Sequence, residues 1–85
     1  MSYYVYILKS LKNNDIYVGS TENLENRISL HNRGRVRSTK TCRPWVLLEH
    51  RPCNSRSEAV RLEQFLKTGQ QKELLRRKYG GMAKG

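Results

Sequence analysis

Residues 3–8, Tyr-Tyr-Val-Tyr-Ile-Leu, and residues 16–21, Ile-Tyr-Val-Gly-Ser-Thr, decide the fold of this chain. Both stretches are rich in aromatic and β-branched residues, and the segment 12–15 between them is polar and turn-prone, which predicts an antiparallel hairpin with strands over residues 2–9 and 16–19. Alternation along the first strand places Tyr4, Tyr6 and Leu8 on one face and Tyr3, Val5 and Ile7 on the other. Because both faces are apolar, we expect this strand to be central in its sheet.

A short helix is predicted directly after the hairpin, ending at about Asn32 before Gly34. Either Thr21 or Asn23 is suited to cap its first turn. Its buried side is expected to consist of Leu24, Ile28 and Leu30. Arg27 and His31 are four residues apart, so the two side chains project from one edge of this helix.

The second half of the chain predicts one strand and two helices. The strand covers residues 45–49, Trp-Val-Leu-Leu-Glu, and residues 55–58, Ser-Arg-Ser-Glu, form a capping box that opens a helix. That helix is expected to turn Ala59, Leu62, Phe65 and Leu66 inward and to end near Gly69. A last helix covers about residues 71–79, and a disordered tail covers residues 80–85. The predicted fold is a single α/β domain over residues 1–79, a three-stranded antiparallel sheet flanked by helices in the order β-β-α-β-α-α.

Positive charge dominates the composition. The 85 residues include 17 Lys and Arg but only 7 Asp and Glu, which gives a net charge of +10 and a pI near 10.1. Such a surface favours polyanions, nucleic acid first, although a basic protein also suits ribosomes or anionic lipid. Residues 33–44 contain no acidic residue and are expected to form a mobile loop, with Val36 as its one sizeable apolar anchor before Cys42. The candidate DNA-binding residues in this loop are Arg33, Arg35, Arg37, Lys40 and Arg43.

Several protein classes are disfavoured by the sequence. The longest apolar run is far shorter than the ~20 residues that cross a bilayer, and no signal peptide is expected. Cys42 and Cys53 do not form a C-x-x-C pair and make a poor zinc site with two distant histidines. We therefore expect a cytoplasmic monomer with free thiols and no membrane association.

The order of these motifs resembles that of the GIY-YIG nuclease domain over about residues 3 to 67. Residues 4–6, Tyr-Val-Tyr, stand at the first tripeptide of the family and residues 17–19, Tyr-Val-Gly, at the second. Arg27 and Glu63 follow in the expected order, and the Arg-x-x-x-His-Asn pattern is similar to that of compact members and of branched-DNA resolving subunits. The resemblance implies an endonuclease that hydrolyses phosphodiester bonds in DNA, of the repair or branched-DNA type, with Mg²⁺ or Mn²⁺ as cofactor.

The resemblance also implies a role for each site residue. Tyr17 becomes the candidate general base, Arg27 the phosphate clamp and Glu63 the metal ligand, while Tyr6 positions or assists the attacking water and His31 is a second candidate proton acceptor. A free phenol titrates near pH ~10, so a nearby divalent ion and Arg27 would have to lower the pKa of Tyr17. Glu63 borders the apolar face of its helix, where a carboxylate needs a partner, either a cation or an ion pair with Arg27 or Arg56.

Two departures from the family pattern and two alternative functions remain at this point. Tyr4 replaces the glycine of the first tripeptide, and no asparagine follows Glu63. Family enzymes that cut chosen sites usually carry a separate targeting domain, which we do not expect in this chain, so a protein partner that supplies targeting is one alternative. The alternatives to an enzyme active alone are a non-catalytic nucleic-acid-binding module and a nuclease subunit activated by a partner. RNA remains an alternative substrate to DNA.

Overall fold

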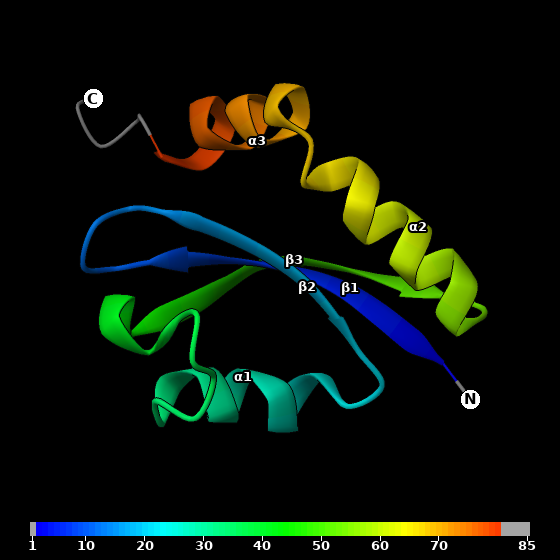
Figure 1. The fold of residues 1–85 in the computed structure, drawn as a ribbon, viewed down its shortest axis with the longest axis horizontal. Coiled ribbons are helices and arrows are strands. Elements are labelled where there is room, and N and C mark those ends of the chain that lie inside the picture. Colours follow the sequence, from blue (N-terminus) through cyan, green and yellow to red (C-terminus); the bar gives the residue numbers. More distant parts are fainter. Residues whose placement is uncertain (1, 81–85) are drawn as a thin grey trace.

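The computed structural model describes residues 2–80. Its elements are β1 (Tyr3–Ser10), β2 (Ile16–Thr21), α1 (Leu24–Asn32), the 3-10 turn η1 (Lys40–Cys42), β3 (Trp45–Cys53), α2 (Arg56–Leu66), α3 (Gly69–Leu75) and the π-helical turn η2 (Arg76–Gly80). The strands form one antiparallel sheet in the order β2-β1-β3, with α1 on one face and α2 and α3 on the other (Figure 1). The predicted α/β class, the three-stranded sheet and the central first strand are confirmed. Apart from Gly80, the predicted disordered tail lies outside the described residues.

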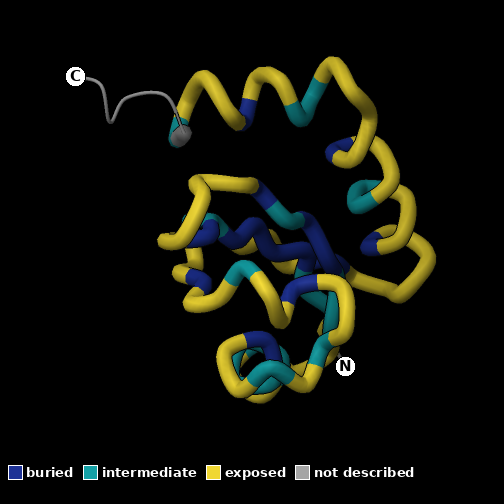
Figure 2. The backbone as a smooth tube through the Cα atoms, turned by 60° about the vertical axis from the view of Figure 1, so that its left-hand side comes forward, coloured by how far each residue is buried: buried dark blue, intermediate teal, exposed yellow. Residues whose placement is uncertain are grey.

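Burial is concentrated in the central strand (Figure 2). Residues Val5, Tyr6, Ile7 and Leu8 are each at most 1% exposed, because β1 is covered on both faces. The predicted alternation holds. On the α1 side of the sheet, Tyr6, Leu8 and Trp45 form a buried cluster. On the other side the core consists of Val5, Ile7, Ile16, Val18, Cys53, Ala59, Leu66 and Leu75.

The third strand is longer than predicted. It continues through residues 50–52 to Cys53, and the pairing with β1 shifts register between Ile7 and Leu8, which face Glu49 and Leu47. This extension contains Pro52, which has no backbone N–H donor. Because β3 pairs on one side only, a residue without an N–H donor is tolerated there.

The helices decide between the two predicted caps of α1 and correct two other predictions. The cap of α1 is Asn23, whose side chain accepts from the backbone N–H of Asn26. Gly69 does not terminate α2 but opens α3, because the Thr68 side chain caps that helix. Phe65 was expected inside and is 54% exposed. No helix of residues 2–80 has the length and apolar character needed to cross a membrane.

The capping box is present with one difference. The Ser55 hydroxyl accepts from the N–H of Glu58, but the Glu58 carboxylate accepts from Asn54 rather than from Ser55. The box therefore joins α2 to the end of β3.

The basic loop is held at more points than predicted. Thr39 is 1% exposed, and its carbonyl oxygen accepts from the Trp45 indole at 2.9 Å. The Ser10 hydroxyl donates to the Cys42 carbonyl at 2.5 Å. Val36 is the one sizeable apolar residue before Cys42, but polar contacts that a hydropathy pattern does not record also hold the second half of the loop. Its mobility remains a prediction.

Gly19 is required by a close contact across the hairpin. It pairs with Tyr6, and a Cβ atom at Gly19 would lie 2.6 Å from the Tyr6 hydroxyl and 3.0 Å from a ring carbon of Tyr17. Gly69 offers a matched control, since a Cβ there meets nothing within 4 Å.

We expect Gly19→Ala to lower the free energy of unfolding by about 1–3 kcal/mol, because the buried Tyr6 ring must move to admit the methyl group. Gly69→Ala should be neutral or slightly stabilising, since alanine favours a helix. Urea unfolding measures both changes. Equal stability of the two variants would contradict the close packing of Tyr6 on Gly19.

Candidate active site at the edge of β2

The centre of the candidate site is a chain of hydrogen bonds from β1 to the basic loop. The Tyr6 hydroxyl lies 2.9 Å from His31 Nε2, and His31 Nδ1 lies 2.8 Å from Thr39 Oγ1. Tyr6 reaches His31 because its side chain lies on the face of the sheet that α1 covers, and His31 lies in the last turn of α1. His31 is fully buried, at 0% exposure.

The direction of each hydrogen bond follows from the single hydroxyl proton of Thr39. Thr39 Oγ1 lies 3.4 Å from the Val36 carbonyl oxygen, and when it donates its proton there, it accepts from His31 Nδ1–H. The other nitrogen of a neutral imidazole is an acceptor. The Tyr6 hydroxyl therefore donates to His31 Nε2.

The pKa shifts of both groups agree with this assignment. Burial, with a smaller effect from the Arg27 charge, lowers the pKa of His31 to about 4, so the imidazole is neutral at physiological pH. Burial raises the pKa of Tyr6 to about 12, against the opposing effect of a hydrogen bond with Arg27. Tyr6 thus keeps the proton that it donates.

Arg27 and Tyr17 lie beside this chain. The pKa of Arg27 is raised, first by hydrogen bonding with Tyr6 and to a smaller degree by Tyr17. The Tyr17 ring packs edge-on against His31, with ring centroids 4.9 Å apart, and against Trp45 at 6.1 Å. The Arg27 guanidinium therefore lies near the phenols of Tyr6 on β1 and Tyr17 on β2.

Glu63 approaches the same strand from α2, on the other side of the sheet. Its Oε1 accepts a hydrogen bond of 2.6 Å from the Ser20 hydroxyl on β2. Its Oε2 lies 2.8 Å from Lys67 Nζ, and that ammonium lies 5.8 Å from the centroid of the Tyr17 ring. The carboxylate is therefore fixed at the edge of β2 and linked to Tyr17 through Lys67. Neither Arg27 nor Arg56, the ion-pair partners considered from sequence, forms this pair.

The site offers a divalent ion one carboxylate, that of Glu63. Within residues 2–80 no group of three or more His, Cys, Asp or Glu side chains is placed to hold a metal. Mg²⁺ is commonly held by one or two carboxylates, waters and substrate phosphate oxygens rather than by a protein cage. The half-buried Glu63 carboxylate fits that mode, provided that Lys67 withdraws from Oε2.

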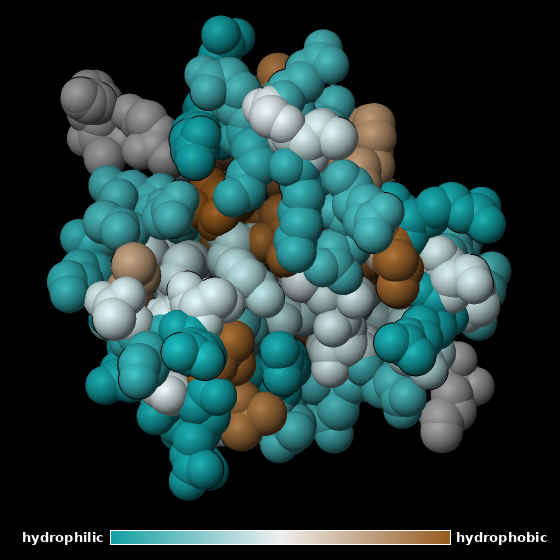
Figure 3. Space-filling view, in the orientation of Figure 1, coloured by the Kyte–Doolittle hydropathy of each residue, from teal (hydrophilic) through white to brown (hydrophobic). Residues whose placement is uncertain are grey.

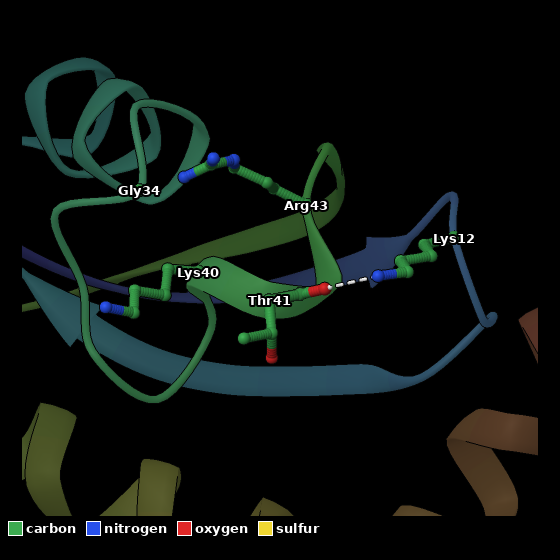
Figure 4. Close-up of a pocket in the computed structure, with 5 residues that line it drawn as sticks. All are labelled: Lys12, Gly34, Lys40, Thr41 and Arg43. Carbon is green, nitrogen blue, oxygen red and sulfur yellow. Dashed lines mark hydrogen bonds between the residues drawn. The ribbon is translucent and has the colours of Figure 1, made fainter.

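A basic hollow lies beside the loop (Figure 4). It has a volume of about 590 Å³ and is lined by Lys12, Gly34, Lys40, Thr41 and Arg43. Lys12 donates to the Thr41 carbonyl at 3.0 Å. The Arg43 guanidinium packs on Gly34, whose φ of 78° and lack of a Cβ atom both suit glycine.

The five candidate DNA-binding residues of the loop are all exposed. Within the described part of the chain, none of them takes part in an ion pair with an acidic side chain. Their charge is therefore available to an external anion. Figure 3 shows that much of the visible surface is hydrophilic, with only scattered apolar spots.

Several contacts of the site were missed by the sequence reasoning. Asn32 ends α1, as predicted, and its side chain also donates to the Trp45 carbonyl and accepts from the Trp45 N–H, which fixes the start of β3 against α1. Thr39, Ser20 and Lys67 were also not predicted. Strand alternation places Ser20 beside Val18 on the α2 side, and the spacing of Lys67 from Glu63 is that of a helical ion pair. The positions of Ser20 and Lys67 could therefore be predicted from the sequence, whereas the burial of Thr39 could not.

The fold, together with tyrosine, arginine and glutamate side chains around β2, defines a nuclease-type α/β domain. Residues 2–79 match the family model described as the GIY-YIG catalytic domain. The chain therefore belongs to the GIY-YIG family, and the match extends beyond the residues 3 to 67 recognised in the sequence.

The chain is also similar to small proteins that carry the name UPF0213. It is 44% identical over 75 residues to one from Staphylococcus haemolyticus, covering 87% of this chain and 90% of that protein. One from Staphylococcus saprophyticus is 36% identical over 74 residues, covering 85% and 89%. The solution NMR structure of one from Bacillus halodurans has a TM-score of 0.55 at 32% identity, covering 98% of this chain and 90% of that one.

The buried His31 makes stability depend on pH. Because its pKa is about 4 in the folded chain and near 6.5 in the unfolded chain, the unfolded state binds more protons between these values. The free energy of unfolding should therefore fall as the pH drops through this window. The expected loss from His31 is about 2 kcal/mol between pH ~7.5 and ~5. Urea unfolding at several pH values measures it.

His31→Gln should flatten this pH dependence, whereas His50→Gln, which changes the exposed histidine on β3, should leave it unchanged. The same slope in all three proteins would show that His31 is not held neutral in the folded state.

Proposed function

We propose that this chain is a divalent-metal-dependent endonuclease that hydrolyses phosphodiester bonds in DNA, of the repair or branched-DNA processing type. The observation that carries the proposal is that the Ser20 hydroxyl holds the Glu63 carboxylate at the edge of β2, the strand of Tyr17, while Tyr6 and Tyr17 lie near enough to Arg27 of α1 to raise its pKa. A phosphoryl group needs a cation for its developing charge and a group to take a proton from water. This cluster offers both.

Each residue has a defined task in this proposal. Arg27 binds the non-bridging phosphate oxygens. Tyr17, after its hydroxyl has lost its proton to solvent, would hold the attacking water as a phenolate and accept one proton from it, which restores the neutral phenol. Glu63 would hold Mg²⁺ or Mn²⁺, which when bound stabilises charge on the phosphate and eases departure of the leaving oxygen. The hydrogen bond from Ser20 aims the carboxylate.

Tyr6 and His31 are better suited to positioning than to proton transfer. Both are buried, and His31 Nε2 is already engaged by the Tyr6 hydroxyl. In this role His31 fixes Tyr6, and Tyr6 fixes the guanidinium of Arg27. The general base is therefore assigned to Tyr17 rather than to His31.

The basic loop provides the contact with the substrate backbone. The hollow lined by Lys12, Lys40 and Arg43 lies next to Thr39, which is itself bonded to His31. A strand whose phosphates follow the loop would thus pass close to Tyr17. Such contacts are electrostatic and independent of sequence, so selectivity would come from DNA structure or from a partner protein.

Two further functions fit parts of the same surface. The exposed loop cations favour a nucleic-acid-binding module without turnover, which needs no metal. A nuclease subunit activated by a partner would be inactive alone. Supercoiled, branched and single-stranded DNA, with RNA in parallel, should be incubated with and without Mg²⁺ or Mn²⁺ to separate these functions.

Glu63→Gln should lower the rate of DNA cleavage by at least about 100-fold, because it keeps the shape but removes the charge that holds the ion. Arg27→Ala should cause a loss of about 100-fold to 1000-fold, since it removes the donor to the phosphate. Single-turnover cleavage of a labelled branched duplex measures both rates. Arg61→Ala, an exposed change on α2, serves as the control.

If wild-type protein cuts neither DNA nor RNA in Mg²⁺ or Mn²⁺, the isolated chain is not an active nuclease. The binding and partner-dependent functions then remain. Cleavage that persists in Glu63→Gln would instead contradict the assigned ion site.

Binding without metal should depend on the loop. Replacing both Lys40 and Arg43 with Gln should reduce the log–log salt slope of duplex binding by about 2, since two phosphate contacts are lost from a slope of roughly −4 to −5. Arg61→Gln should not change it. Fluorescence anisotropy from low to physiological salt measures the slope. A wild-type slope in the double variant would show that DNA binds to another surface of the protein.

A further inference from the structure

Lys67 occupies the position between Glu63 and Tyr17. Its ammonium is 2.8 Å from Glu63 Oε2 and 5.8 Å from the centroid of the Tyr17 ring. The other carboxylate oxygen accepts the hydrogen bond of Ser20. Both oxygens of the one carboxylate assigned to the ion therefore have partners within the protein.

The ion pair of Glu63 with Lys67 follows from helical spacing but is expected to be weak. The two residues are four apart, and Lys67 directly follows the last residue of α2, so the ion pair forms without help from the rest of the fold. The Lys67 side chain is 45% exposed. Ion pairs of this kind add little to stability, so the ammonium is free to leave when a better partner arrives.

We propose that Lys67 is an internal cation that holds the Glu63 carboxylate until nucleic acid binds, and then moves to a phosphate oxygen so that the divalent ion takes its place. This inference rests on the proposed function, since it assumes that Glu63 is the ion ligand. An ammonium and a divalent ion repel each other, so the presence of one at the Glu63 carboxylate weakens the binding of the other. A phosphodiester near Tyr17 offers the ammonium an alternative anion.

The consequence is reciprocal coupling between two ligands. Nucleic acid that draws Lys67 away raises the affinity of Glu63 for the ion, and by linkage the ion raises the affinity for nucleic acid by the same factor. Free protein therefore binds the ion weakly, which restrains cleavage until a substrate phosphate is in place.

The matched variants are Lys67→Met and Arg77→Met. Methionine keeps an apolar stem against Tyr17 but removes the charge. Arg77 also forms an ion pair with an acid four residues earlier, Glu73 at 3.6 Å, so its variant controls for net charge and for loss of a helical pair. Glu63→Gln reports whether ion binding depends on the proposed ligand.

Mn²⁺ affinity without nucleic acid is measured by electron paramagnetic resonance of the free ion, with circular dichroism to confirm folding. Lys67→Met should bind Mn²⁺ about tenfold more tightly than wild type, because a unit charge at contact distance is removed from a partly solvated site. Arg77→Met should match wild type, and Glu63→Gln should not bind. In cleavage assays, Lys67→Met should reach half-maximal rate at a lower Mn²⁺ concentration.

Unchanged or weaker Mn²⁺ affinity in Lys67→Met, with binding that still depends on Glu63, would overturn the role of Lys67 and leave the proposed function standing. Equal tightening in Arg77→Met would also overturn it, because the effect would then be one of net charge. Mn²⁺ binding that does not depend on Glu63 in any variant would contradict both this inference and the ion site of the proposed function.

Discussion

The Tyr6 side chain, packed across Gly19 with its hydroxyl on His31, is the contact on which the rest of the site depends. It joins the central strand, the edge strand and α1 in one buried place. Since an unpaired buried donor or acceptor costs about 1–3 kcal/mol, Tyr6 and His31 hold each other in place. The second ring nitrogen of His31 is hydrogen-bonded to Thr39, which ties the basic loop to the same place. Tyr6 in turn interacts with Arg27.

A second constraint acts from the opposite side of the sheet. Glu63 belongs to a helix that does not cover the Tyr6 face, yet its carboxylate reaches β2 through Ser20. An edge strand permits this, because its outer side carries no further strand. Candidate site residues from both layers therefore approach β2 where the sheet ends, Tyr17 on the α1 side and Glu63 from α2.

The sequence predicted the fold well because its strongest signals are local. Alternation in the hairpin, the Asn23 cap and the spacing of Arg27 with His31 are each readable within a few residues. The length of β3 and the role of Gly69 were wrong, because β3 continues as an edge strand through residues 50–52 and the Thr68 cap overrode the glycine. Long-range polar contacts, such as the clamp of Asn32 on Trp45 and the burial of Thr39, leave no periodic signal. The catalytic roles stay proposals, since they rest on the family pattern rather than on a local pattern.

The central claim is that His31 is a buried, neutral acceptor that fixes Tyr6. Long-range ¹H–¹⁵N correlation spectra of the imidazole rings test it most directly, because the two nitrogens differ in shift when only one is protonated. The account predicts that His31 keeps a proton on Nδ1 and a bare Nε2 from pH ~5 to ~8, while the exposed His50 serves as the internal reference. A His31 ring that carries protons on both nitrogens near pH ~6, or a proton on Nε2 alone, would contradict it.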